Sequence, residues 1–175
     1  MKTNQKGIKI LHEFETCAEK LPDGRLKAYL CPAAKKAIKE GRPPFYTIGW
    51  GNTTYENGQP VQKDDIITQE RADELFENIL TEFEEMAEKA IVSQVNENQF
   101  SAFVSALYNI GHGNNSKDGL IRLKNGNPST LLRKINTDPG DETIAAEFMK
   151  WISKGTNYEN GLKKRRAVES NLYFQ

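Results

Sequence analysis

The sequence predicts an α+β fold with a small β-containing N-terminal lobe, a long connecting helix and a helical C-terminal lobe. Three observations lead to this prediction. Turn signals crowd residues 20–62, one unbroken amphipathic pattern fills residues 68–91, and helical spacing returns over residues 92–175. We expect all 175 residues to form a single domain, in which an N-terminal helix joins the helical lobe.

The N-terminal region is expected to begin with a helix over residues 5–19 and to continue as a small sheet region over residues 20–62. In that region LPDG, EGRPP and ENGQP are turn signals, and Asn57-Gly58 predicts a β-hairpin. The segment TIGWG has the β-branched and aromatic character of a strand. The helix carries apolar residues at helical spacing, namely Ile8, Leu11, Phe14 and Ala18.

The remaining chain is expected to be helical. Thr68 caps the connecting helix over residues 68–91, and Asn96 with Gln99 forms a capping box for the next helix, which Gly111 ends. Residues 112–127 are rich in Gly, Asn and Lys, so we expect a surface loop there. Three further helices are expected, from Asn127-Pro128 through Ile135, from Asp141 through Ile152, and from Gly161 to about Phe174.

Composition narrows the class of protein. The net charge is zero and 37% of residues are hydrophobic, which suits a globular core. No run of 18 apolar residues occurs and the N-terminus lacks the apolar stretch of a signal peptide, so we expect a cytoplasmic protein without a membrane span. Cys17 and Cys31 are expected to be free thiols. The run Lys163–Arg166 is either a solvated helix face or a contact for an anionic polymer.

Glu15 is the first residue that suggests chemistry. On a helical wheel it falls between Ile8 and Leu11, whereas Glu13 points toward solvent. A carboxyl group on an apolar face is either paired with a cation or partly desolvated. Desolvation disfavours the charged form and suits such a group to donate a proton. The alternative is a buried ion pair with an arginine.

Other chemistries find little support in the sequence. His12 and His112 lie far apart and lack zinc-type spacing, so no metal is expected. No Gly-rich phosphate loop and no GxSxG motif occurs, so no cofactor is expected either. Trp50 and Trp151 are expected in the core.

Several short motifs follow one another along nearly the whole chain. In order they are FE-T, R-LKAYLCP, YTIGWGNT, QFSAFVSALYNIG, PSTLLRKIN, EFMKW and GLKKRRAVESNL. Their order resembles that of the bacteriophage lysozymes, or endolysins, which are inverting muramidases. The resemblance implies a lysozyme-like fold, lysis of bacterial walls and hydrolysis of the bond from N-acetylmuramic acid to N-acetylglucosamine.

The same resemblance assigns roles to individual residues. Glu15 matches the catalytic acid of the family, Cys31 the second catalytic position, which is often Asp, and Thr47 the threonine that helps to hold the attacking water. A thiol can orient a water by weak hydrogen bonding, and a thiolate could act as a base. Inversion requires room for that water opposite the leaving group. The positions that match substrate-binding residues are Asn52, Thr53, Tyr108 and Asn109.

The chain departs from the family pattern in two respects. Residues 16–24 and 32–46 lengthen the spacing around the predicted site, and the second insertion reads as an excursion at an exposed turn. A cysteine at position 31 weakens a two-carboxylate mechanism, so Asp23 and Glu40 are alternative bases.

Rival functions stay open at this point. A lytic transglycosylase needs the acid but no positioned water, and a wall-binding protein on the same fold needs neither. A DNA-binding helical protein is the least expected alternative, because the net charge is zero and no basic stripe occurs. The expected partner is a peptidoglycan strand, bound by a monomer without nucleic acid or stable membrane association, after release from the host cytoplasm to the wall.

Overall fold

The computed structural model describes residues 1–15 and 19–175. The chain divides into two compact units. We call Met1–Phe14 with Glu82–Gln175 the helical unit, and Glu15–Thr81 the β-containing unit. The connecting helix α3 (Gln69–Ala90) contributes residues to both units, as the amphipathic pattern of residues 68–91 predicted.

The β-containing unit is built on very short strands. Strand β1 (Leu26–Lys27) pairs antiparallel with β2 (Ile66–Ile67), and single bridges join the other segments. Tyr46, Tyr55 and Ile67 pack on a buried cluster formed by Ala28, Ile48 and Val61. The unit therefore has its own small core.

The structure confirms the turn at Asn57-Gly58 but corrects its surroundings. Tyr55 N–H donates to the Gln59 carbonyl at 2.9 Å, yet the flanking segments form only the isolated bridge between Thr54 and Pro60. The expected excursion over residues 32–46 is also wrong in part, because helix α2 (Pro32–Lys39) forms there. Its first residue is a proline, which suits the first turn of a helix, and Ala34 and Ala37 bury one face.

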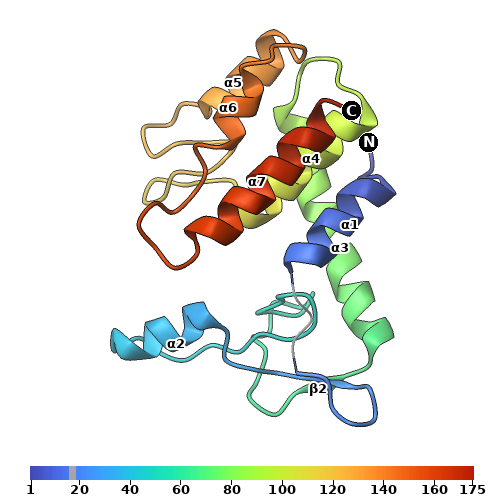
Figure 1. The fold of residues 1–175 in the computed structure, drawn as a ribbon. Coiled ribbons are helices and arrows are strands. Elements are labelled where there is room, and N and C mark those ends of the chain that lie inside the picture. Colours follow the sequence, from blue (N-terminus) through green and yellow to red (C-terminus); the bar gives the residue numbers. More distant parts are fainter. Residues whose placement is uncertain (16–18) are drawn as a thin grey trace. The chain divides into compact units, whose positions relative to one another are not determined.

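The helical unit is centred on α4, whose apolar face is fully buried. Helix α7 runs alongside α4, and α1 contacts both of them (Figure 1). The two shorter helices α5 and α6 contact each other, and α6 contacts α7. The helices of this unit other than α3 are α1 (Gln5–Phe14), α4 (Glu97–Ile110), α5 (Thr130–Thr137), α6 (Ile144–Phe148) and α7 (Glu159–Tyr173).

Local capping signals account for the helix ends that were predicted well. The Asn96 side chain accepts from Gln99 N–H and the Gln99 side chain accepts from Asn96 N–H, both at 2.9 Å, which confirms the capping box. Gly111 ends α4 with φ of 88°. Thr68 Oγ1 accepts from Arg71 N–H at 3.2 Å at the start of α3.

Other helix bounds differ from those expected. Helix α1 ends at Phe14, and Ala18, on which the longer prediction depended, lies outside the described residues. Ser129 rather than Asn127 caps α5, because its hydroxyl accepts from Leu132 N–H. Helix α6 ends at Phe148 instead of Ile152, and α7 begins at Glu159, two residues before Gly161.

The basic run near the C-terminus is not a solvated face throughout. Arg165 and Arg166 are buried and both pair with Glu169, at 3.0 Å and 2.6 Å. Ser105 Oγ donates to the same carboxylate at 2.8 Å. Removing water from charged groups is costly unless they are paired, and this ion-pair network ties α7 to α4.

Of the helices in the described part of the chain, none has both the length and the apolar character needed to cross a bilayer.

Candidate functional site

The segment TIGWGN forms a tight turn that is fixed on both sides. Thr47 pairs with Tyr29 through two backbone hydrogen bonds of 2.9 Å, and Ile48 pairs with Asn52 across the turn. The Tyr29 bridge brings the segment that ends at Cys31 beside the turn. The turn itself needs backbone conformations that favour glycine, since φ is 57° at Gly49 and 102° at Gly51.

Helix α3 anchors this turn. Trp50 Nε1 donates to Asp73 Oδ1 at 2.6 Å, and Gln69 Nε2 donates to the same oxygen at 2.9 Å. A Cβ at Gly49 would lie 2.9 Å from the Cβ of Ala72, so the turn backbone packs closely on the helix. Trp50 is only half-buried, which corrects its expected place in the core. Its role is to hold the turn through a polar contact and a ring contact with α3.

Glu15 lies beside this turn. Its Oε2 atom is 3.5 Å from the position that a Cβ at Gly51 would occupy. Glu15 is half-buried and follows the last residue of α1, so its position on a helical wheel does not explain its environment. A Cβ at Gly51 would therefore stand at ordinary van der Waals distance from the carboxylate. Glu13, in contrast, is exposed as predicted.

Thr47 and Asn52 are buried polar residues of the same turn. Their side chains are 3% and 2% exposed, and neither Thr47 Oγ1 nor the Asn52 amide has a hydrogen-bond partner within residues 1–15 and 19–175. Residues paired across an antiparallel bridge project to the same face, so Asn52 shares the face of the core residue Ile48. By alternation, Thr47 and Thr53 project to the other face. A buried polar group without a partner is costly unless water or ligand satisfies it.

Cys31 is a half-buried free thiol at the start of α2. Its carbonyl accepts from Lys35 N–H at 3.0 Å, while its thiol caps no backbone amide of the described chain. The sulfur is therefore not committed to holding the helix end. Cys17 lies outside the described residues.

The two alternative bases are exposed carboxylates paired with arginines. Asp23 accepts from Arg25 Nε at 2.8 Å, and this hydrogen bond lowers the pKa of Asp23. Glu40 likewise pairs with Arg42, which lowers the pKa of Glu40. Both pairs lie within their own turns. In the described ranges, no group of three or more His, Cys, Asp or Glu residues is arranged to hold a metal ion.

Tyr108 and Asn109 belong to the helical unit. The Tyr108 ring contacts Phe83 at a centroid distance of 5.0 Å, and the side-chain oxygen Oδ1 of Asn109 accepts from Arg166 Nη2. Because Arg166 is held by Glu169, the buried ion-pair network orients the Asn109 amide at the surface. The amide of Asn109 is exposed.

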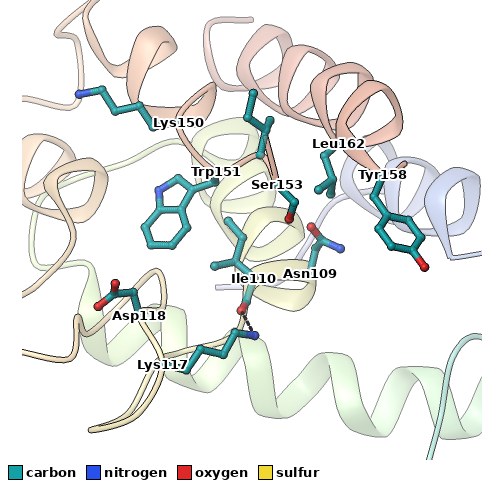
Figure 2. Close-up of a pocket in the computed structure, with 10 residues that line it drawn as sticks. Asn109, Ile110, Lys117, Asp118, Lys150, Trp151, Ser153, Tyr158 and Leu162 are labelled. Atoms are coloured by element: carbon teal, nitrogen blue, oxygen red, sulfur yellow. Dashed lines mark hydrogen bonds between the residues drawn. The ribbon is translucent and has the colours of Figure 1, made fainter. Parts of the chain in front are cut away.

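A pocket of about 450 Å³ opens beside Asn109 in the same unit. Figure 2 shows the Trp151 ring, the Asn109 amide and the Ser153 hydroxyl around one space, with the Lys150 ammonium pointing away. Trp151 is half-buried and lines this pocket, so its expected place in the core is wrong. Tyr158 and Asp118 line it as well and were not predicted, because they lie in irregular segments without a motif.

These features have counterparts in known proteins. The solved structure of an endolysin from Escherichia coli O157:H7 phage FAHEc1 matches with a TM-score of 0.72 and 27% identity, covering 100% of this chain and 94% of that one. The α+β fold, with its small sheet unit, long shared helix and helical unit, is thus lysozyme-like.

The sequence comparisons are more specific. A family model described as phage lysozyme matches residues 19–169, and the chain belongs to this family. It is 32% identical over 174 residues to an endolysin of Bacillus phage B103, covering 99% of this chain and 54% of that protein, so it spans about half the length of that relative. An endolysin of Acyrthosiphon pisum secondary endosymbiont phage 1 is 30% identical over 178 residues, covering 99% of this chain and 98% of that protein.

Proposed function

We propose that this chain hydrolyses the β-1,4 bond between N-acetylmuramic acid and N-acetylglucosamine in bacterial peptidoglycan, with Glu15 as the general acid. One observation carries the proposal. The Glu15 carboxylate lies beside Gly51, in the turn whose first residue, Thr47, has a buried hydroxyl without a partner in the described chain. An acid and an unsatisfied polar group near one rigid turn suit a reaction that moves one proton and positions one water.

In the proposed reaction, the protonated Glu15 carboxyl gives its proton to the glycosidic oxygen as the bond from that oxygen to C1 breaks. A water adds its oxygen to C1 from the opposite face of the sugar, which inverts the configuration. Thr47 Oγ1 and the Cys31 sulfur hold that water, and its proton passes to the Cys31 thiolate or to solvent. Thr47 Oγ1 has no hydrogen-bond partner in the described chain, and the Cys31 thiol caps no backbone amide there, so both groups suit a water.

Substrate-binding groups are proposed in each unit separately. Thr53 is exposed on the face of the turn that Thr47 shares, so its hydroxyl suits a sugar contact. In the helical unit, the amide of Asn109 and the ring of Trp151 line one pocket and suit an acetamido group and an apolar sugar face. Asn52 is proposed for its buried amide, which has no partner in the described chain, although its bridge partner Ile48 lies in the core.

A lytic transglycosylase is the second candidate, and the cysteine at position 31 favours it. Such an enzyme uses the acid and needs no positioned water, because the sugar's own hydroxyl attacks C1. The unpartnered Thr47 hydroxyl favours hydrolysis instead. Mass spectrometry of the fragments released from purified peptidoglycan separates the two. Reducing muramic ends support hydrolysis, whereas 1,6-anhydro ends support transglycosylation, and release of no fragments supports a binding protein.

The setting of the reaction is proposed along with it. We infer that the chain acts as a monomer on the glycan strand, without a cofactor or nucleic acid. In a phage infection it would stay in the host cytoplasm until it is released to the wall.

A further inference from the structure

A second pocket, of about 340 Å³, lies entirely within the β-containing unit. Three lysines that are distant in the sequence line it. Lys27 comes from β1, Lys35 from the first turn of α2, and Lys63 from the turn before β2. Glu19 is the one carboxylate among the described residues that line the pocket, and Tyr29 and Tyr46 add aromatic walls. The pocket is therefore a concave site with an excess of positive charge.

The positive charge of this pocket is poorly compensated. Lys27 Nζ lies 3.5 Å from Asp64 Oδ1, which is itself strongly exposed. Lys35 and Lys63 form no ion pair with any residue of the described ranges. Lysines that line one concavity raise the local concentration of anions there. Such an arrangement selects a negatively charged ligand.

The walls of the pocket are held in place by the fold. Asp65 fixes the turn that carries Lys63, since its carboxylate accepts from Tyr55 Oη and from Gln62 N–H, both at 2.8 Å. The Asp65 carbonyl accepts from Ala28 N–H at 2.9 Å. Burial, together with the hydrogen bond to Asp65, raises the pKa of Tyr55 to about 12, so this contact persists over the whole neutral range. The turn that carries Lys63 is thus held to the segment of Ala28 by hydrogen bonds.

We propose that this pocket binds an oxyanion of the bacterial wall polymer, either a phosphate of a phosphodiester-linked chain or a carboxylate of a peptide stem. The identification of the bacterial wall as the source of this anion rests on the proposed function. The binding of an oxyanion in the pocket does not depend on it. Lysine ammonium groups and tyrosine hydroxyls are donors that both oxyanions accept. Because Tyr29 pairs with Thr47, an anion in the pocket would hold the polymer beside the turn that carries the proposed water-binding group.

Sedimentation of the Glu15→Gln protein with insoluble walls tests this proposal, because it measures binding without requiring cleavage. We expect Lys35→Gln and Lys63→Gln each to weaken binding roughly threefold, and the double variant about tenfold. The matched control is Lys36→Gln, which removes the same charge from the same helix outside the pocket and should change binding less than about twofold. An equal loss in Lys36→Gln would overturn the proposal, since general attraction would then explain it.

Three wall preparations identify the anion. Gram-positive walls carry both sources, acid extraction removes the phosphate polymers, and amidation of extracted walls removes the carboxylates. If the lysine-dependent part of binding disappears on extraction, the ligand is phosphate; if it disappears only on amidation, the ligand is carboxylate.

Lysine-dependent binding that survives both treatments overturns the proposal. So does equally tight lysine-dependent binding to vesicles containing phosphatidylglycerol, which would indicate a lipid surface instead. Cleavage of the walls by Glu15→Gln would refute Glu15 as the general acid and leave this inference intact. Lysine-dependent wall binding by a wild-type protein that releases no fragments would refute the proposed hydrolysis and still support this inference.

Discussion

The carboxylate of Glu15 lies beside Gly51, with Glu15 Oε2 3.5 Å from the position that a Cβ at Gly51 would occupy. Glu15 follows a helix and Gly51 lies in a turn with φ of 102°. The turn is held by Trp50 and Asp73, so the glycine presents a fixed backbone surface to the carboxylate. This contact leads to the first prediction.

We expect Gly51→Ala to lower wall cleavage about tenfold or more, because an alanine strains the backbone at φ of 102° and relief of that strain shifts the turn beside the carboxylate. The strained φ should also cost ~1 kcal/mol of unfolding free energy. Gly58→Ala is the matched control, since φ there is 78° and no atom lies within 4 Å of the added Cβ. Turbidity assays and urea unfolding of both variants check this. Similar activity in the two variants would argue against a functional contact at Gly51.

Replacement of Thr47 by valine should separate function from stability. The hydroxyl is buried and has no partner in the described chain, so removing it should leave stability unchanged or raise it by ~1 kcal/mol. Cleavage should fall at least about tenfold, because the proposed water loses a hydrogen bond. Thr47→Ser keeps the hydroxyl and should keep most of the activity. A stable, fully active Thr47→Val protein would exclude Thr47 from the reaction.

Cys31 can be tested by exchanging its sulfur for other groups. We expect Cys31→Ala to lower the turnover number about tenfold or more, and Cys31→Asp to retain activity, since a carboxylate also holds a water. Cys31 is the N-cap residue of α2, and Asp is a preferred N-cap, so Cys31→Asp should raise the unfolding free energy by ~0.5–1 kcal/mol. Wild-type turnover in Cys31→Ala would make the thiol a bystander.

Acid unfolding should report on Glu147. Burial alone would raise the pKa of Glu147, but hydrogen bonds from Lys150 and Lys134 outweigh it and lower that pKa below 4.5. A lowered pKa means that the stabilisation is present above about pH 4.5 and is lost as the pH falls through the folded-state value. Glu147→Gln should therefore cost ~1–2 kcal/mol at pH 7 and flatten the decline in stability below pH 5. The exposed Glu142→Gln is the control, and identical pH profiles in all three proteins would contradict the assignment.

The well-predicted parts of the fold are those with strong local signals. Helix α3 has an unbroken apolar stripe, and α4 has a capping box at Asn96 and a glycine at its end. In contrast, α2 is short and flanked by Pro and Gly residues, so its sequence was interpreted as a turn region. The pairing of Leu26 with Ile67 joins distant two-residue strands, which no local periodicity reveals.

The site was predicted by motif order more than by helical geometry. Glu15 was selected for its place on a helical wheel, but α1 ends before it, and the fold places its carboxylate beside Gly51. Burial of Arg165 and Arg166 depends on Glu169 at helical spacing, a pattern present in the sequence but hidden within a basic run. The pocket around Trp151 and the lysine pocket bring together residues from separate segments, so only the folded chain reveals them.

Cleavage of purified peptidoglycan by Glu15→Gln, followed through the release of reducing ends, is the most direct test of Glu15 as the proton donor. Glu13→Gln serves as the control, because Glu13 is an exposed carboxylate two residues away. We expect a loss of at least about a hundredfold in Glu15→Gln, with unchanged thermal unfolding, and wild-type rates in Glu13→Gln. Reducing ends released by Glu15→Gln at the wild-type rate would contradict the proposed mechanism.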